Sequence, residues 1–592
     1  MGIIYLIISL ILFVSTILVK KTDKKQNILF WTILTAVVFL AYNLFCGYIL
    51  LLVKLKTTLV TFSVINLIIS AILIRKIYKD KQMQEYYIKI KDVIILLLLL
   101  LTIVIIGYKQ YGFPFKVKYE TTDPAVHFHV AEEIYNEKTL KWNCSMPGAS
   151  LNTAILFDIF DFIVPEQDFY CLYIIFDLII LYLISAMFYI GIVNKEDSIL
   201  KSIIAFIFSL LFVCGYPLNS MLFGFAYLSV GILMMTAIVF IVPYLKSREI
   251  NNIPLCIYIF LLAFGLFFSY YFFVPVIYAS IGLYILFDMI KNRNKKNILS
   301  IVTKENILKV LVILILPTIA GFSYFVLPGI FQTGDIAASH IGAEGYIYRD
   351  LYSNFIYLAP LVLFFCIDKI KSKKNCFFNI TFILTTIFAI ALLYMGLKGK
   401  SSSYYYYKTY YLISILIMGM SVKSIYKLMD NKLQIYAYSY LFIYIAIIIA
   451  SLFGIDEKIT QKSALFSPNN YLKAYTDLYT FNYSKVVGDG KILSEEQIKA
   501  IKYLNDKEIN KDEITTYGNF LQMMWASNVG KITETDDMYL LQFPIEFDLQ
   551  GWLDNDSKKY LIYFDTSKEV EKETDKYRTI YEKEDVIILE KK

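Results

Sequence analysis

Charged residues, histidines and paired cysteines are scarce in this 592-residue chain. Only 18% of the residues are charged, and only three are histidines. The seven cysteines form no CxxC pair and no Cys/His spacing typical of zinc sites, so neither a disulfide framework nor a zinc site is indicated. The net charge of +7 is concentrated in short loops, and the polar C-terminal part is not basic. This distribution excludes a nucleic-acid partner.

Apolar residues are abundant and are arranged in long blocks. Hydrophobic residues make up 58% of the chain, and its mean hydropathy is +0.57. The blocks are about 17 to 25 residues long, which is the length that a helix needs to cross a bilayer. The sequence therefore predicts a polytopic α-helical membrane protein with about fourteen transmembrane helices. The first block, residues 2–19, has no small-residue cleavage site after it and is expected to be an uncleaved anchor.

The distribution of lysine and arginine predicts the orientation in the membrane. Basic clusters at 20–25, 75–79, 246–248, 291–296, 369–374 and 423–427 fall in alternate loops. Because basic residues are preferentially retained on the cytoplasmic side, we assign these loops to the cytoplasm. Both termini and the long loop 109–168 then face outward, as expected for a multi-pass protein of the cell membrane.

The first outer loop, residues 109–168, is a long polar interruption of the apolar pattern. It holds two of the three histidines, in the run Asp123-Pro-Ala-Val-His127-Phe-His129. Aspartate is a good N-cap and proline is favoured at the first helical position, so a helix is predicted to begin at Asp123. Asp123 and His127 then lie on one face of that helix. Residues 151–161 alternate apolar residues with aspartates and predict a second, interfacial helix.

Two further outer segments carry candidate binding residues. Residues 328–352 include His340 and Arg349, and Gly334, Gly342 and Gly345 in this segment suit a mobile flap. Residues 396–409 include Lys398, Lys400, Lys408 and a run of tyrosines that begins at Tyr404. Lysines on the outer side run against the orientation rule, so we interpret them as candidates for binding an anionic ligand such as a lipid phosphate.

The chain divides into three regions. Residues 1–90 form an added set of helices, residues 91–454 form the main membrane module, and residues 455–592 have the composition of a soluble domain. A capping-box helix start at Ser494 and apolar strands at 560–565 and 585–590 predict a small α/β domain outside the membrane.

A membrane helix followed by a long outer loop with Asp123-Pro-Ala-Val-His127 resembles the GT-C superfamily of polytopic membrane glycosyltransferases. These enzymes use sugars linked to polyprenyl phosphate. The resemblance covers residues 91–592 in architecture, whereas its motif is short. The chain departs from several members by its three extra leading spans and by the lack of an Asp-x-Asp pair in the loop. The second departure disfavours a bound divalent metal, so no cofactor is expected.

The resemblance implies an inverting transfer of a sugar to a cell-envelope glycan, teichoic acid, lipid or protein. Asp123 would be the general base, and His127 would orient Asp123 or the sugar. Lys398, Lys400, Lys408 and Arg349 would bind the donor phosphate, and His340 and Tyr404 would contact substrate.

Each assignment has a structural alternative. Asp123 can act only as an N-cap, the histidines can be packing residues, and the lysines can bind lipid headgroups. Glu132, Glu133 and Asp158 read as solvated helix faces. Asp177, inside an apolar span, is either functional or satisfied by a neighbouring helix. For the whole chain, the alternative is a transporter or flippase for a lipid-linked glycan, although no internal repeat is seen. A receptor or scaffold would leave the histidine-bearing loop unexplained.

Overall fold

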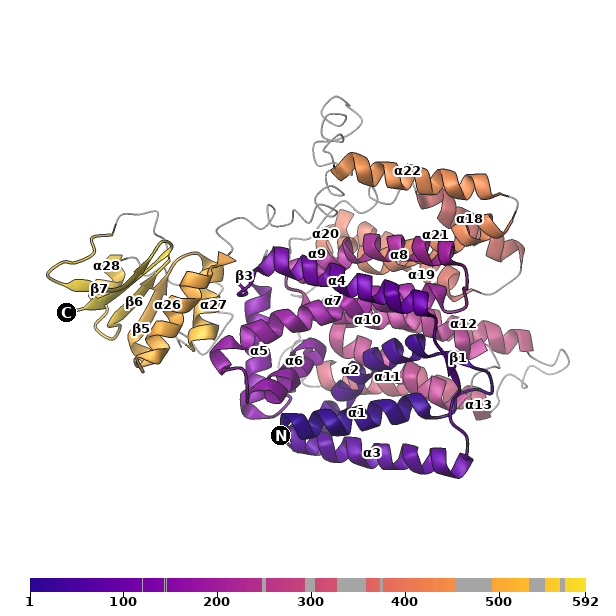
Figure 1. Cartoon of the computed structure of the whole chain (residues 1–592), viewed down its shortest axis with the longest axis horizontal. Helices are drawn as coiled ribbons and strands as arrows, with labels where there is room; N and C mark the ends of the chain where they lie inside the picture. Colours follow the sequence, from indigo (N-terminus) through magenta and orange to yellow (C-terminus); the bar gives the residue numbers. More distant parts are fainter. Residues whose placement is uncertain are drawn as a thin grey trace.

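The computed structural model describes most of the chain, with gaps. The described residues are 1–119, 121–142, 144, 146–246, 252–292, 304–326, 358–372, 376–431, 433–452, 492–531, 549–564 and 570–592. Figure 1 shows a bundle of helices that run along the long axis of the molecule, with a smaller C-terminal unit at one end.

Long apolar helices make up the bundle. Among the described residues, ten stretches are long and apolar enough to cross a membrane, and α1 (Gly2–Leu18) is a shorter apolar helix. The chain is therefore a multi-pass helical membrane protein, whereas the count of fourteen spans stays a prediction. The main helices are α2 (Ile28–Leu52), α3 (Leu59–Asp80), α4 (Ile90–Tyr111), α7 (Phe169–Val193), α8 (Ile199–Val213), α9 (Tyr216–Leu222), α10 (Ala226–Ile241), α11 (Asn252–Tyr270), α12 (Val274–Asn292), α13 (Lys304–Val310), α14 (Leu316–Gly321), α18 (Ala359–Lys371), α19 (Phe377–Leu397), α20 (Ser403–Lys408), α21 (Tyr410–Asp430) and α22 (Gln434–Leu452).

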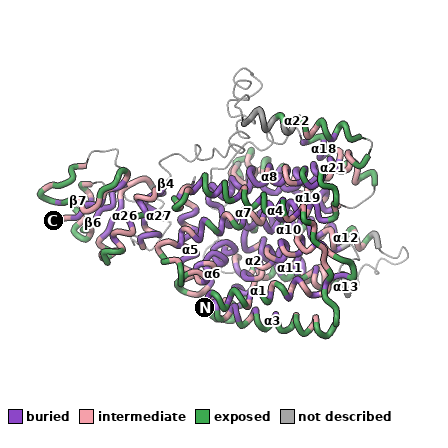
Figure 2. Tube along the Cα trace, in the orientation of Figure 1, coloured by how far each residue is buried: buried purple, intermediate pink, exposed green. Residues whose placement is uncertain are grey.

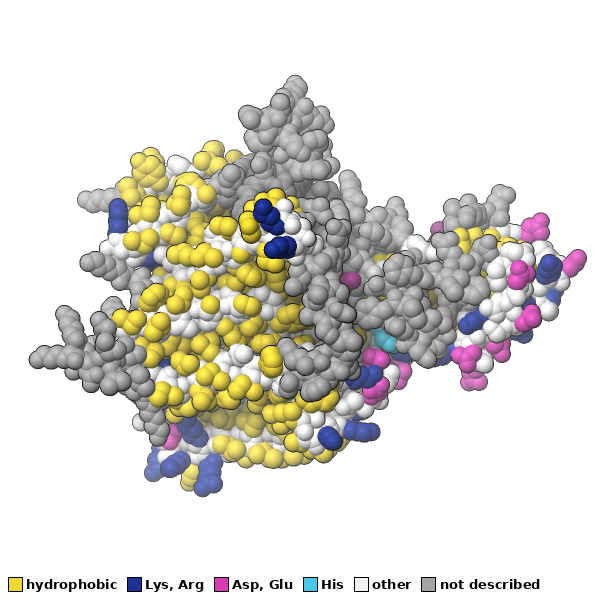
Figure 3. All heavy atoms as spheres, turned by 180° about the vertical axis from the view of Figure 1, so that it is seen from behind, with side chains coloured by type: hydrophobic (Ala, Val, Ile, Leu, Met, Phe, Trp, Pro, Cys, Tyr) yellow, Lys and Arg dark blue, Asp and Glu magenta, His cyan; other side chains and the backbone are white. Residues whose placement is uncertain are grey.

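Helix α10 lies at the centre of the bundle. Every residue from Ala226 to Ile241 is buried, as expected for a helix that is apolar on all sides. It packs mainly against α11 and α7. Peripheral helices such as α3 expose much of their apolar surface (Figure 2). The space-filling view shows a broad band of hydrophobic side chains across the bundle (Figure 3), which is the surface that a lipid bilayer would cover.

One apolar stretch contains two helices. The 38-residue stretch Ile253–Ile290 holds α11 and α12, which are separated by a 3-10 turn at Tyr271–Phe273. The turn brings Tyr270 and Ser269 to the end of the bundle where α5 (Asp123–Glu137) lies, which we call the α5 end. The N-terminus is also at this end, since Gly2 closely approaches Ile159 of α6 (Pro147–Phe160).

Helix α6 differs from its prediction as an interfacial helix. Most of its residues are buried, and it packs against α5, α2, α7 and α10. Gly148 lies so close to Ser269 that an added Cβ would be 2.2 Å from the Ser269 hydroxyl oxygen. The alternation of apolar residues and aspartates is real, but neighbouring helices rather than lipid headgroups cover the apolar side.

The C-terminal unit is a four-stranded sheet with flanking helices. Its strand order is β5-β6-β8-β7, with β5 and β6 parallel and the other pairs antiparallel. The predicted capping-box helix and both predicted strands are present, as α26, β6 and β8. The elements are β4 (Ile492–Leu493), α26 (Glu495–Asp506), β5 (Ile514–Tyr517), α27 (Phe520–Gly530), α28 (Leu549–Asp554), β6 (Tyr560–Tyr563), β7 (Tyr577–Lys583) and β8 (Val586–Lys591).

Contacts join this unit to the α5 end of the bundle. Strand β4 pairs with β3 (Val117–Lys118), which lies between α4 and α5, and helix α27 packs on α5. A further ion pair joins Lys502 of α26 to Asp168, just before α7.

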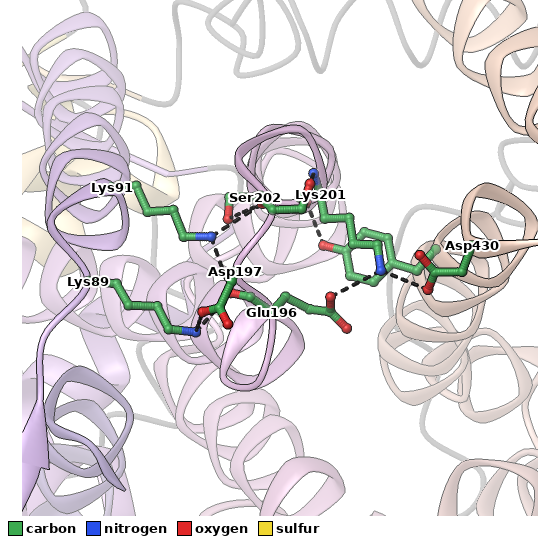
Figure 4. A network of polar contacts seen from close by, with 9 residues as sticks. Lys89, Lys91, Glu196, Asp197, Lys201, Ser202 and Asp430 are labelled. Carbon is green, nitrogen blue, oxygen red and sulfur yellow. Dashed lines mark hydrogen bonds and ion pairs between the residues drawn. The ribbon is translucent and has the colours of Figure 1, made fainter. Parts of the chain in front are cut away.

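The opposite end of the bundle, near β1 (Gln26–Asn27), is held by a network of lysines and acids (Figure 4). Lys201 of α8 bridges Glu196, at 3.1 Å, and Asp430 at the end of α21, at 2.8 Å. Lys89, just before α4, pairs with Asp197 at 2.9 Å. The network ties α4, α8 and the far end of α21 together. It therefore helps to fix the helix whose other end reaches the α5 end.

Candidate active site

Asp123 is the first residue of α5 and lies at the α5 end of the bundle. Thr122 is the N-cap and forms no side-chain capping bond, so the helix begins where the sequence predicts but the Asp123 carboxylate does not act as its N-cap. Pro124 packs directly on Gly224, which precedes α10. Gly224 has a φ of +76°, and a Cβ there would lie 2.0 Å from the ring of Pro124, so only glycine fits. This contact fixes the start of α5 against the bundle.

Lys408 is the cation that the fold brings to Asp123. It ends the short helix α20, whose start is capped by the Ser402 hydroxyl accepting from the Tyr404 backbone N–H at 3.1 Å. The lysine is only 4% exposed. Its ammonium lies over three aromatic rings, at 4.1 Å from the centroid of Tyr404, 5.1 Å from Tyr270 and 5.2 Å from Phe225. The rings form an aromatic cage around a buried positive charge.

Asp123 and Lys408 act on each other without a direct contact. Burial raises the pKa of the Asp123 carboxyl above its ordinary value, and the Lys408 ammonium partly opposes that rise. No ion pair or hydrogen bond joins the two side chains, and within the described residues Lys408 has no carboxylate within 4.0 Å. A buried cation with no direct anionic partner is costly, and such a residue is therefore a candidate for binding a ligand or taking part in a reaction.

His127 lies one turn after Asp123 and is buried. Its ring packs edge-on against Tyr227 of α10, with centroids 4.6 Å apart. Burial lowers the pKa of His127 to about 4, and the nearby Lys408 adds to the effect. His127 is therefore neutral near pH 7 and has one donor and one acceptor nitrogen. No hydrogen bond joins it to Asp123, so the predicted orienting role would act on the substrate instead.

The remaining predicted site residues are placed differently. Lys398 and Lys400 lie in the turn between α19 and α20 and are exposed, and of the three lysines only Lys408 acts on the Asp123 carboxyl. Tyr404 belongs to the cage. His340 and Arg349 lie outside the described residues, so the structure does not place them.

Glu132, which reads as a solvated position in the sequence, is buried. Its carboxylate pairs with Lys531 of the C-terminal unit, and burial raises the pKa of Glu132 to about 7 although Lys531 opposes the rise. Glu133 is only partly covered, as predicted, and pairs with Lys141 at 3.2 Å. The sequence could not separate these neighbours because the partner of Glu132 lies in a distant part of the chain.

Helix α27 of the C-terminal unit covers the outer face of α5. The Asn528 side chain donates to the backbone carbonyl of Ala125 at 2.8 Å. Trp525 packs against Phe128 of α5, with ring centroids 5.3 Å apart, and is fully buried. These contacts were not predicted, and neither were the cage residues Phe225 and Tyr270. Gly224, a glycine just before the buried helix α10, is a sequence signal that could have pointed to this position.

The site has the groups for proton transfer near a buried lysine. A carboxylate that can accept a proton, a neutral imidazole and a caged ammonium converge at one end of an apolar bundle. Within the described part of the chain, no three His, Cys, Asp or Glu side chains converge as metal ligands.

Comparison with known proteins does not identify the chain. No protein-family model matches it, and no curated protein matches it. We therefore infer the function from the site and from the family resemblance of the loop that contains Asp123.

Proposed function

We propose that the protein is an inverting membrane glycosyltransferase of the GT-C type. It would move a sugar from a polyprenyl-phosphate donor to an acceptor of the cell envelope on the outer side of the cell membrane. The observation that carries the proposal is the pair of Asp123 and Lys408, a carboxyl and a caged ammonium that share one end of the bundle without contact.

Asp123 and Lys408 suit the two groups that react at the sugar, which are the acceptor and the donor phosphate. The donor's lipid tail would lie along the apolar surface of the bundle, with its phosphate near Lys408. Asp123 would face the acceptor on the other side of the sugar. Lys398 and Lys400 are exposed at the same turn and would act earlier, by attracting the anionic headgroup. Arg349 and His340 remain candidate contacts of the donor.

The chemical step needs one proton acceptor and one stabilising cation. The acceptor hydroxyl loses its proton to the Asp123 carboxylate while its oxygen attacks the anomeric carbon. The bond from that carbon to the phosphate oxygen breaks, and its electron pair stays on the phosphate. Lys408 stabilises the added negative charge because the ammonium is already in place and buried. His127, being neutral, can hold a sugar hydroxyl by donating or accepting.

The test is transfer by purified protein in lipid vesicles that contain a polyprenyl-phosphate sugar and candidate acceptors. Asp123→Asn keeps the shape of the side chain but removes the base, and we expect kcat to fall about 10²- to 10⁴-fold. Asp158→Asn is the control, because Asp158 is an outer-loop aspartate that pairs with Lys138 at 3.0 Å and is not in the site. Undiminished transfer by Asp123→Asn would remove Asp123 as the base.

The same vesicles separate transfer from translocation. A flippase for a lipid-linked glycan would move the labelled donor across the bilayer without forming a new glycosidic bond. If the labelled donor crosses the bilayer without forming product, in wild type and in Asp123→Asn alike, the protein is a flippase and the glycosyltransferase proposal is wrong.

A further inference from the structure

A second buried acid, Asp177, lies in a group of polar side chains that the proposed transfer does not use. Asp177 is in α7 and is only 2% exposed. Tyr119, from the segment before α5, donates to its Oδ2 at 3.0 Å. Tyr111 at the end of α4, Tyr173 of α7 and Trp525 of α27 pack around Tyr119. Their ring centroids are 5.6 Å, 6.4 Å and 6.1 Å from that of Tyr119.

Several polar atoms of this group have no hydrogen-bond partner in the described part of the chain. They are Asp177 Oδ1, the hydroxyl of Tyr173 and the indole N–H of Trp525. All three side chains are at most 2% exposed. An unsatisfied buried polar group costs about 1 to 3 kcal/mol, so three together in one place need an explanation. Buried water that bonds to several such atoms at once is the usual one.

The group reaches toward Asp123. Tyr173 interacts electrostatically with both Asp177 and Asp123, and its ring meets Phe128 of α5 edge-on at 5.7 Å. Tyr119 precedes Asp123 in the same segment, and Trp525 closes the group from the C-terminal unit. Four separate parts of the chain therefore meet in a buried cluster of polar side chains next to the base.

We propose that Asp177, Tyr111, Tyr119 and Tyr173 enclose buried water that carries the proton from Asp123 to Asp177. The second part of this proposal rests on the proposed transferase function, whereas the presence of water does not. Protonated Asp123 gives its proton to a water molecule, and that water gives one of its own protons to the Asp177 carboxylate. Only O–H bonds form and break, and the water is regenerated. The proton returns to solvent through Asp123 after the products leave.

Few titratable groups face Asp177. The groups that face it are Tyr119 from the preceding segment, Tyr111 from α4 and Tyr173 from its own helix. No lysine, arginine or histidine of the described residues pairs with it. In this proposal, Asp177 receives the proton from Asp123 through water and does not touch the substrate.

The presence of buried water in this cluster is tested without measuring activity. In radiolytic hydroxyl-radical labelling of the whole protein in vesicles, buried water produces radicals next to the side chains that it touches. We expect Tyr111, Tyr173 and Trp525 to be labelled although they are buried. Tyr258 is the control, because it is equally enclosed but its hydroxyl bonds to Thr35 at 2.8 Å. Labelling of these residues no stronger than that of Tyr258 would overturn the water site.

The proton role is tested with a matched pair of variants. Asp92 is also fully buried in a transmembrane helix and accepts from Tyr189 at 2.8 Å, but it lies near the opposite end of the bundle. We expect Asp177→Asn to lower kcat by about tenfold or more, to leave the donor KM unchanged and to increase the solvent deuterium isotope effect on kcat. Asp92→Asn should leave kcat and the isotope effect as in wild type, and Asp177→Glu should restore part of the rate.

Equal effects of Asp177→Asn and Asp92→Asn on kcat and on the isotope effect would overturn the proton role, because they would show a shared loss of helix packing. The result is separable from the proposed function. If Asp123→Asn abolishes transfer while Asp177→Asn does not affect it, only the proton path fails.

Discussion

At the level of single residues, the Asp123 carboxyl and the Lys408 ammonium set the pH at which the site works. A general base must be ionised, and burial raises the pKa of Asp123 above the ordinary value of about 3.9. The rate should therefore fall as the pH drops through this raised pKa, so the acid limb of kcat/KM lies at higher pH than an ordinary aspartate would give. Lys408 opposes the rise, so Lys408→Gln should move the acid limb to still higher pH. A pH profile of transfer from pH 4 to pH 8 measures both the acid limb of the wild type and its shift in Lys408→Gln.

The control for this profile is Lys398→Gln. Lys398 is exposed and does not act on Asp123, so its loss should lower the rate at every pH without moving the limb. A limb that stays in place in Lys408→Gln, or that moves equally in both variants, would contradict the electrostatic coupling of Asp123 and Lys408. The position of the limb decides the question even where the total rate is low.

At the level of elements, the sequence predicts well where helices lie along the chain. It predicts poorly which segments contact one another. Hydropathy locates the long apolar helices, and the Asp-Pro pair locates the start of α5, because both are local properties of the chain. The aromatic cage around Lys408 joins residues from three separate helical segments, and no local pattern shows that they meet. For the same reason, the sequence could not tell buried Lys408 from exposed Lys398 and Lys400, and it placed α6 in the lipid interface.

Helix α27 supplies the next prediction, because it holds the helix that presents Asp123. Asn528→Ala removes the hydrogen bond to Ala125, in the first turn of α5. A lost hydrogen bond is worth about 0.5 to 1.5 kcal/mol, so we expect kcat to fall by about two- to tenfold with the fold retained. Lys502→Ala is the control, because it breaks another contact of the same unit, to Asp168 rather than to α5. Equal losses in the two variants would show only that docking of the unit matters, without a specific role for α27.

At the level of the whole molecule, the question is which end of the bundle faces the outside of the cell. The N-terminus, α5 and the C-terminal unit share one end, and β1 with the lysine network of Figure 4 marks the other. The charge rule predicts that the first end lies outside the cell, where lipid-linked sugars would meet envelope acceptors. Everything proposed for Asp123 requires this orientation, because a base that faced the cytoplasm could not act on an extracellular acceptor.

Labelling of single cysteines in intact cells tests this orientation directly. In a background without the seven native cysteines, Lys56→Cys and Lys572→Cys should react with a membrane-impermeant maleimide. Lys56 is exposed beside Thr57, whose backbone N–H donates to Lys138 at the end of α5, and Lys572 is an exposed residue of the C-terminal unit. Lys79→Cys, exposed near the opposite end of the bundle, should react only after the cells are permeabilised. The reverse pattern would place Asp123 on the cytoplasmic side and would exclude transfer to an outer acceptor. All three labelled positions are exposed, so burial cannot account for a difference between them.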